Sequence, residues 1–218
     1  MLIISCVSQK GGVGKTSIVI HLAIAAVEAG LEVLVIDLDL QRSTERWSER
    51  RRAEKPVIVA GLASKLPEMI KTARAHGVDI VLIDTPPTVD KTALAAAKAA
   101  DIVLVPTGQS FLDLQAIGDT VRMLKEDNSA GKAVIVFNGL KGAARQRLEA
   151  IEAAREYGLE VLDASLADRI AYSRSLDRGK GVTELGAKNA AAKEIKALLN
   201  DLLARQPQKR RKLVKVNT

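Results

Sequence analysis

The sequence predicts an α/β fold: a doubly wound, mostly parallel sheet in a Rossmann-like three-layer arrangement, flanked by helices. Two observations support this class. Short runs rich in β-branched residues alternate with longer segments of helical character along the 218-residue chain. Several of the short runs are apolar on both faces, as parallel strands covered by helices must be. Strands and helices that alternate in this way are joined by right-handed crossovers.

The expected strands are the short apolar runs, at residues 2–8, 32–39, 56–60, 79–86, 101–107, 133–138 and 160–164. The expected helices lie between and after them, at residues 16–29, 43–53, 64–76, 90–99, 111–127, 143–157 and 187–204. Many of these helices are followed by a glycine, which favours the left-handed backbone that ends a helix: Gly30, Gly77, Gly131 and Gly158. We expect residues 1–204 to form a single domain and residues 205–218 to form a flexible basic tail.

Composition is that of a soluble globular protein. Hydrophobic residues make up 47% of the chain and charged residues 27%, and no apolar stretch reaches the length that spans a membrane. A single cysteine, Cys6, excludes a disulfide framework and leaves no cysteine pair for zinc or an iron–sulfur cluster. We therefore expect a cytoplasmic protein. The net charge of +7 fits either a polyanionic partner or simple solubility.

The stretch SQKGGVGKTS, residues 8–17, ends like a phosphate-binding loop. It follows an apolar strand and opens an amphipathic helix, a context that makes the Gly-Lys-Thr tripeptide far more specific than it is alone. The glycines let backbone N–H groups converge on phosphate oxygens at the start of the helix. Lys15 is expected to reach the β- and γ-phosphates of a nucleotide, and the Thr16 hydroxyl to bind Mg²⁺. A glycine-rich turn without a ligand is the alternative.

Acidic residues end two of the expected strands, at the edge of the sheet where such folds bind ligands. Asp84 ends the run VLID and fits a Walker B carboxylate that holds the Mg²⁺ shell. Asp37 and Asp39 lie where the second strand ends. One of them could order the Mg²⁺ environment while the other positions or deprotonates the attacking water. Aspartates that only cap strand ends are the alternative.

The loop departs from the ordinary pattern G-x-x-x-x-G-K-[ST], because Gln9 replaces the first glycine and Lys10 is an additional lysine. With this lysine, the run KGGVGKT resembles the deviant Walker A motif of the ParA/MinD superfamily of ATPases. The chain is similar to the small ParA-type partition and positioning ATPases. The resemblance covers nearly the whole chain, through residues 8–17, 35–51, 79–87, 101–117 and 167–186.

The resemblance implies a P-loop NTPase fold and a weak ATPase with ATP and Mg²⁺ as cofactors. It implies catalytic roles for Lys10, which would reach the phosphates of a partner subunit's ATP, for Lys15, and for Asp39, which would activate water. Thr16, Asp37 and Asp84 would form the Mg²⁺ shell. Asn138 matches the position that reads adenine, and the 163–174 loop would complete the base pocket. The implied nucleotide-binding residues are Gly11, Gly12, Val13, Gly14, Lys15, Thr16, Ser17 and Asn138.

The resemblance further implies a function in DNA partition or cargo positioning. An ATP-bound homodimer would bind non-specific DNA on the nucleoid, until hydrolysis stimulated by DNA and a ParB-like adaptor releases it. Aromatic residues make up only 2% of the chain, so phosphate contacts rather than base stacking would bind DNA. Basic residues are dense at 42–52 and in the tail. The candidate DNA contacts are Arg205, Lys209, Arg210, Arg211 and Lys212.

Two alternatives remain open. A MinD-like membrane-associated positioning ATPase would need a terminal amphipathic helix with bulky apolar anchors, and the tail offers only Leu213, Val214 and Val216 among its cations. A metabolic P-loop enzyme of the same fold is the other. Relative to the family, Leu40 replaces a common proline and Arg42 a small residue. We also expect the chain to lack the N-terminal DNA-reading domain of larger relatives. The sequence does not identify the cargo.

Overall fold

The computed structural model describes residues 1–88, 91–186 and 189–206. In this part of the chain, eight strands pair in parallel, in the order β3-β2-β4-β1-β5-β6-β7, with β8 beside β6. The strands are β1 (Leu2–Cys6), β2 (Val33–Asp37), β3 (Val57–Ala60), β4 (Ile80–Asp84), β5 (Ile102–Thr107), β6 (Ala133–Leu140), β7 (Glu160–Val161) and β8 (Leu166–Ala167). The predicted α/β class and the parallel sheet are confirmed.

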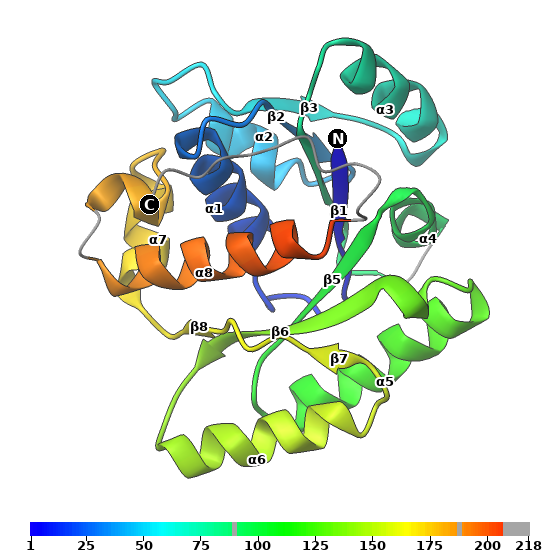
Figure 1. The fold of residues 1–218 in the computed structure, drawn as a ribbon, viewed down its shortest axis with the longest axis vertical. Helices are drawn as coiled ribbons and strands as arrows, with labels where there is room; N and C mark the ends of the chain where they lie inside the picture. Colours follow the sequence, from blue (N-terminus) through cyan, green and yellow to red (C-terminus); the bar gives the residue numbers. More distant parts are fainter. Residues whose placement is uncertain (89–90, 187–188, 207–218) are drawn as a thin grey trace.

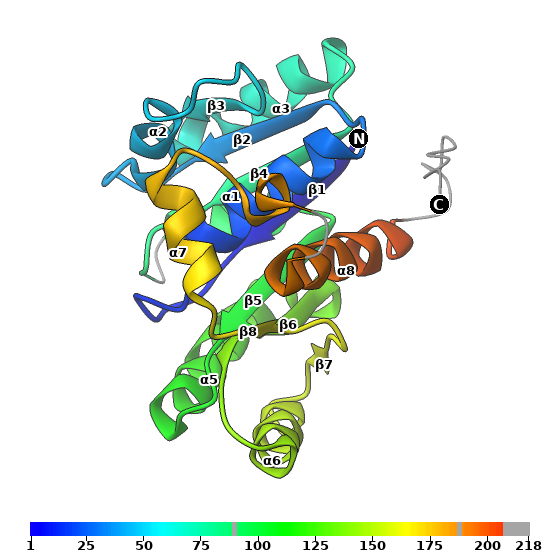
Figure 2. The same cartoon turned by 90° about the vertical axis from the view of Figure 1, so that its left-hand side faces the viewer.

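The helices cover both faces of the sheet (Figures 1 and 2). They are α1 (Lys15–Glu28), α2 (Ser43–Ser48), α3 (Leu66–Ala75), α4 (Lys91–Ala99), α5 (Phe111–Glu126), α6 (Ala144–Arg155), α7 (Ile170–Asp177) and α8 (Ala190–Ala204). Short 3₁₀ turns lie at η1 (Ala63–Lys65), η2 (Ala130–Lys132) and η3 (Val182–Leu185).

Two apolar layers hold the helices on the sheet. Strand side chains alternate between faces, so Ile4 of β1 packs with α1 and α8, whereas Ile3 packs with the layer formed by α3, α4, α5 and α6. Helix α1 lies between the sheet, α8 and α2, and its residues from Ile18 to Ala26 are all buried. This burial explains why α1 is apolar around nearly its whole circumference, so the expectation of an amphipathic helix is wrong.

Some element boundaries differ from those predicted. Helix α2 ends at Ser48 and not at residue 53. Residues 163–174 were expected as a loop but contain β8 and the start of α7. Helix α5 ends before Asn128, whose left-handed backbone (φ 57°) closes the helix, so the expected role of Gly131 is wrong. Gly30, Gly77 and Gly158 have the left-handed backbone expected of them.

His21, on α1, is 1% exposed, and burial lowers its pKa to about 4. The unfolded chain binds a proton at this residue near pH 6.5, and the folded chain does not. The free energy of unfolding is therefore unaffected by His21 above pH 6.5 and falls as the pH is lowered from 6.5 toward 4. We expect this residue to cost about 2 kcal/mol of unfolding free energy at pH 5 relative to neutral pH.

Urea unfolding of the wild type and of His21→Gln, at pH 7.5 and pH 5, measures this loss. The wild type should lose about 2 kcal/mol more than the variant over this range. Comparing the two chains removes the opposite contribution of Asp84, whose raised pKa is common to both. Equal losses in both chains would show that His21 is not the titrating group.

Candidate functional site

The site lies at the edge of the sheet where β1, β2 and β4 end. Asp37 is the last residue of β2 and Asp84 the last of β4, and the two are direct neighbours in the register of these strands. Strand β1 lies on the other side of β4 and leads through residues 7–14 into α1. The parallel arrangement thus brings the predicted phosphate loop and both strand-end carboxylates together.

Two glycines give the loop its shape. Gly12 and Gly14 have left-handed backbones (φ 78° and 88°), and Gly14 is the N-cap residue of α1. The Asn138 amide Nδ2 donates to the carbonyl of Val13 (2.8 Å), and a Cβ on Gly14 would overlap this amide. Only glycine therefore fits at position 14. Gly11 is different, since a Cβ there would make only an ordinary contact with Pro87.

The loop wraps around the ammonium group of Lys15. This side chain is buried, and its Nζ donates to the carbonyls of Ser8 and Lys10, at 3.2 Å each. Burial lowers the pKa of Lys15, while the nearby Cys6, Asp84 and Asp39 oppose that shift. A buried cation that has two neutral carbonyl acceptors is stabilised by a nearby anion, so this loop suits a phosphate group.

Asp84 has the character of a metal-binding carboxylate. Its Oδ2 accepts hydrogen bonds from the hydroxyls of Thr16 (2.7 Å) and Thr44 (2.8 Å). Its Oδ1 is buried without a hydrogen-bond partner among the described residues. Burial raises the pKa of Asp84 to about 6, against the effect of the threonine bonds. A cation beside Oδ1 would offset the cost of burying this charge.

The donor set fits Mg²⁺ better than a metal held only by protein. No cluster of three or more His, Cys, Asp or Glu side chains that could hold a metal occurs within residues 1–88, 91–186 and 189–206. Mg²⁺ needs none, because it keeps several waters and binds one or two carboxylates together with phosphate oxygens. Asp84, Thr16 and Asp37 supply the hard oxygen atoms that this ion prefers.

Asp37 ends β2, and Asp39 begins the turn that leads to α2, since the N–H of Arg42 donates to the carbonyl of Asp39. Asp37 accepts bonds from the backbone N–H groups of Asp39 (3.0 Å) and Thr44 (3.0 Å), and therefore caps α2. Burial raises the pKa of Asp37, while these backbone bonds oppose the shift. Asp39 is only partly buried and accepts from the N–H of Gln41 (2.9 Å).

Thr44, which the sequence reasoning did not single out, bonds to both strand-end carboxylates. Its backbone N–H contacts Asp37 and its hydroxyl contacts Asp84. After the last turn of α2, the buried side chain of Arg51 bonds bidentately to Glu184 (2.9 and 3.0 Å) and to the carbonyl of Gly179. Helix α2 is thus attached at both ends.

A pocket of about 810 Å³ opens beside the loop. Its walls come from the loop and the start of α1, from the segment after β5 and the start of α5, from the end of β6, and from β8 and α7. The lining residues are Gly12, Val13, Ser17, Gly108, Gln109, Ser110, Asp113, Asn138, Gly139, Lys141, Ala167, Asp168, Arg169, Ile170, Tyr172, Ser173 and Leu176. The volume suits a small organic ligand of nucleotide size.

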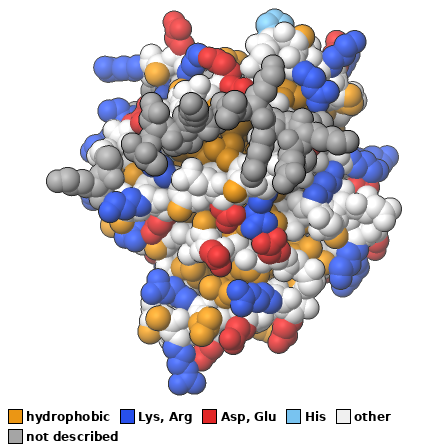
Figure 3. All heavy atoms as spheres, in the orientation of Figure 1, with side chains coloured by type: hydrophobic (Ala, Val, Ile, Leu, Met, Phe, Trp, Pro, Cys, Tyr) orange, Lys and Arg blue, Asp and Glu red, His pale blue; other side chains and the backbone are white. Residues whose placement is uncertain are grey.

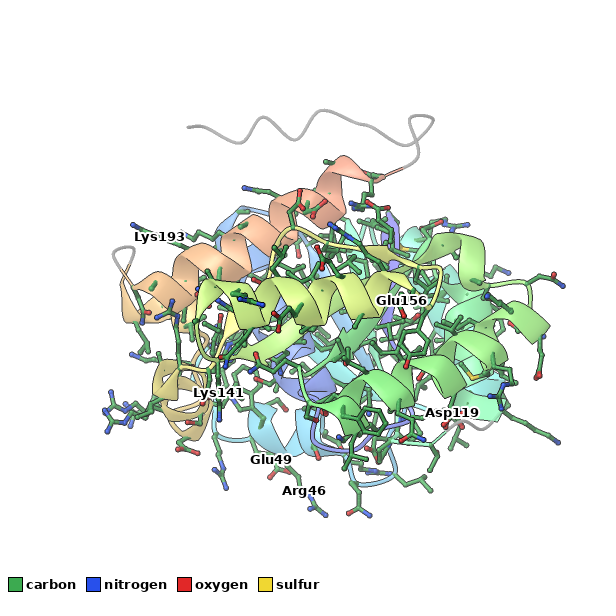
Figure 4. All side chains as sticks on the ribbon, turned by 90° about the horizontal axis from the view of Figure 1, so that it is seen from below. Arg46, Glu49, Asp119, Lys141, Glu156 and Lys193 are labelled. Carbon is green, nitrogen blue, oxygen red and sulfur yellow. The ribbon has the colours of Figure 1, made fainter. Side chains whose placement is uncertain are left out.

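Ser17 and Asn138 line the pocket, and so does part of the 163–174 segment, between Ala167 and Ser173. The role of this segment in a base pocket stays a prediction. Helix α7 was missed, although Gly179 (φ 66°) follows its end and could have indicated a helix. At the rim, Lys141 pairs with Asp168 (2.9 Å); Lys141 is labelled in Figure 4.

The second lysine of the loop lies outside the phosphate cradle. Lys10 directs its Nζ to the Oδ1 of Asp113 on α5, at 2.6 Å. Large apolar side chains are exposed in the neighbouring segments: Leu40 (83%), Phe111 (78%) and Leu112 (64%). Phe111 and Leu112 begin α5 directly before Asp113, so two of these exposed apolar side chains lie beside the Lys10–Asp113 pair.

Of the five predicted DNA contacts, Arg205 is the one that lies within the described residues. Arg205 follows α8, and its guanidinium bonds to both carboxylate oxygens of Glu160 (2.7 Å each) and to Asp201 (2.9 Å). It therefore belongs to the folded part of the chain. The other predicted DNA contacts, Lys209, Arg210, Arg211 and Lys212, lie outside the described residues.

The glycine-shaped loop at the end of β1, its buried lysine and the carboxylate at the end of β4 define a P-loop nucleotide-binding protein. The family model described as the CobQ/CobB/MinD/ParA nucleotide binding domain matches residues 4–182. The chain belongs to this family, which confirms the resemblance to the ParA/MinD superfamily of ATPases.

Individual proteins agree with this assignment. The chain is 31% identical over 194 residues to the Maintenance of carboxysome distribution protein A of Gloeobacter kilaueensis, across 88% of each chain. Its fold is similar to that of the MinD cell division protein of Aquifex aeolicus (TM-score 0.78, 18% identity, covering 94% of this chain and 97% of that one). It is also similar to the septum site-determining protein MinD of Pyrococcus horikoshii, solved with Mg-ADP (TM-score 0.70, 22% identity, 93% and 97%).

Proposed function

We propose that this chain is a ParA-type ATPase that binds ATP with Mg²⁺, dimerises on ATP, and positions a cargo by binding non-specific DNA. The observation that carries the proposal is that the two lysines of the loop lie in different environments. Lys15 is buried inside the phosphate cradle, whereas Lys10 lies at the surface of the same loop. One cation is placed for the chain's own nucleotide, and the other is accessible to a partner.

The residues take the following roles in this proposal. The loop from Gly11 to Gly14 and the N–H groups that open α1 cradle the phosphates, and Lys15 binds the β- and γ-phosphates. Thr16, Asp37 and Asp84 would hold Mg²⁺. Asp39 orients and deprotonates the attacking water. When bound there, Mg²⁺ would neutralise charge on the phosphates. Ser17 and Asn138 face the nucleotide from the pocket wall.

The apolar residues around Lys10 support dimerisation through this face. Leu40, Phe111 and Leu112 are each more than half exposed in the single chain, and a second copy would remove them from water. In such a dimer Lys10 would reach the phosphates of the partner's ATP. A cation supplied across the interface stabilises the dimer only when ATP is bound, so nucleotide state controls assembly.

The charge distribution supports a DNA contact in the tail. Residues 207–218 contain Lys209, Arg210, Arg211, Lys212 and Lys215 and no acidic residue, and so supply five of the seven excess positive charges. On the face drawn in Figure 3, by contrast, basic and acidic side chains are interspersed. Arg205 contributes less, because a phosphate contact would compete with Glu160 and Asp201. Hydrolysis stimulated by a ParB-like adaptor would release the dimer.

The experiment measures binding of the full chain, and of the chain ending at Gln206, to random-sequence duplex DNA at several salt concentrations, with and without Mg-ATP. The full chain should bind only with Mg-ATP. The slope of log affinity against log salt should fall by about 0.9 for each tail phosphate contact that the truncation removes. Ending at Gln206 retains the Arg205 ion pairs, so α8 keeps its contact with β7.

DNA binding that ignores nucleotide would contradict the proposed cycle, and an unchanged salt slope would remove the tail from it. ATP-dependent binding to anionic vesicles in place of DNA would favour a MinD-like membrane role. Among the residues that the structure describes, none of the helices has both the length and the apolar character needed to cross a bilayer.

A further inference from the structure

The ammonium group of Lys10 already has an ion-pair partner within its own chain. Its Nζ lies 2.6 Å from Asp113 Oδ1, and the two side chains are 31% and 18% exposed. A lysine has one ammonium group, so Lys10 cannot hold this position and reach the phosphates of a partner subunit at the same time. The ion pair and the contact across the dimer exclude each other.

Asp113 cannot follow the lysine outward, because helix α5 fixes its carboxylate. Oδ2 accepts from both the backbone N–H and the hydroxyl of Ser110, which completes the capping box of α5. A Cβ on Gly108 would overlap this carboxylate, so glycine makes room for it. Partial burial raises the pKa of Asp113, but the bonds from Lys10 and Ser110 outweigh this effect and hold the pKa below its usual value.

The same loop conformation involves the phosphate-side lysine. The carbonyl of Lys10 accepts from Lys15 Nζ (3.2 Å), and the N–H of Lys10 donates to the hydroxyl of Ser8 (3.3 Å). The backbone of Lys10 is therefore hydrogen-bonded to Lys15 and Ser8, while its side chain is paired with Asp113 on α5. A phosphate group competes with neutral carbonyls for Lys15, because charge-assisted hydrogen bonds are about twice as strong as neutral ones. Phosphate thus releases one of the contacts that fix Lys10.

We propose that Asp113 is a positioning residue that retains Lys10 on its own subunit until nucleotide is bound, and so sets the concentration at which the chain dimerises. This inference rests on the proposed ATP-dependent dimer. Nucleotide phosphate draws Lys15 away from the carbonyl of Lys10, the loop relaxes, and Lys10 exchanges Asp113 for the partner's nucleotide. Without Asp113, the exchange would begin from a lysine that is already free.

The test compares the wild type with Asp113→Asn, with dimerisation followed by sedimentation velocity in a non-hydrolysable ATP analogue and Mg²⁺. Asparagine keeps an acceptor for the Ser110 N–H and removes the negative charge. A partly exposed ion pair changes an equilibrium by up to about fivefold, and it enters twice in a dimer, so half-dimerisation should require up to about 25-fold less protein. Because nucleotide and the ion pair oppose each other, nucleotide affinity measured on the dilute monomer should rise by at most about fivefold and should not fall.

Asp119→Asn is the matched control, since Asp119 lies on α5 and extends outward, as Figure 4 shows, where it pairs with Arg122. It should dimerise like the wild type. A second control separates positioning from mere support of α5. In a Lys10→Ala background, Asp113→Asn should give no gain, because no lysine remains to be released.

Dimerisation of Asp113→Asn at the same or a higher protein concentration than the wild type would overturn this inference alone. A gain that persists in the Lys10→Ala background would also overturn it. A wild type that stays monomeric with the analogue would overturn the proposed function, and the inference with it.

Discussion

Lys15→Ala is expected to lower the affinity for ATP by about 100-fold or more. The buried ammonium of Lys15 lies inside the loop, where its hydrogen-bond acceptors among the described residues are the carbonyls of Ser8 and Lys10. Two charge-assisted bonds to phosphate oxygens, each of about 1.5–3 kcal/mol, account for a loss of this size. Lys10→Ala is the matched substitution in the same loop. It should keep most of the nucleotide affinity and lose the ATP-dependent dimer.

Fluorescent-nucleotide titration of dilute protein gives the two affinities, and sedimentation velocity with Mg-ATP gives the two assembly states. The two variants should separate clearly. Equal loss of binding and of dimer in both variants would refute the division of roles between the lysines. Thermal unfolding without nucleotide serves as the control for folding.

Asp39→Ala is expected to lower the rate of ATP hydrolysis by about 100-fold or more, while ATP stays bound and the dimer accumulates. General bases of this kind contribute about 10²- to 10⁴-fold to a rate. Asp39 is partly buried close to Asp37, and within the described part of the chain its carboxylate accepts a local backbone bond from Gln41. Its removal therefore leaves the Asp84 and Asp37 contacts in place.

Phosphate release under single-turnover conditions measures the rate, and a filter-binding assay measures the retained ATP. Gln41→Ala is the control, because it changes an exposed side chain in the same turn and should hydrolyse ATP like the wild type. A normal rate in Asp39→Ala would show that another group activates the water.

Local patterns were sufficient to predict β1 to β7 and the glycine-rich loop before α1, whereas β8 was missed. Apolar runs between helical segments predicted the parallel strands, because a strand covered on both faces has no polar side. The order Gly-Lys-Thr predicted where α1 begins, since Gly14 needs a left-handed backbone and Lys15 opens the helix. These features depend on residues that are close together in the sequence.

Features that depend on distant residues were missed. Lys10 and Asp113 are 103 positions apart, and Thr44 contacts Asp84 across 40 positions. Arg205 was assigned to a flexible tail because its neighbours are polar and basic, yet Glu160 binds its guanidinium. No periodicity or spacing in the sequence predicts such pairings, because they form only when the folded sheet brings the segments together.

Helix α2 connects two parts of the ligand site: the carboxylates of Asp37 and Asp84, and the pocket wall formed by α7. At its first turn this six-residue helix holds the carboxylates of Asp37 and Asp84 through Thr44. Beyond its last turn, Arg51 fastens it to Glu184 and to the carbonyl of Gly179, directly after α7, a wall of the pocket. We therefore expect occupancy of the pocket to alter the affinity of the carboxylate end for Mg²⁺. The metal in turn should alter pocket affinity by the same factor, even where the two ligands do not touch.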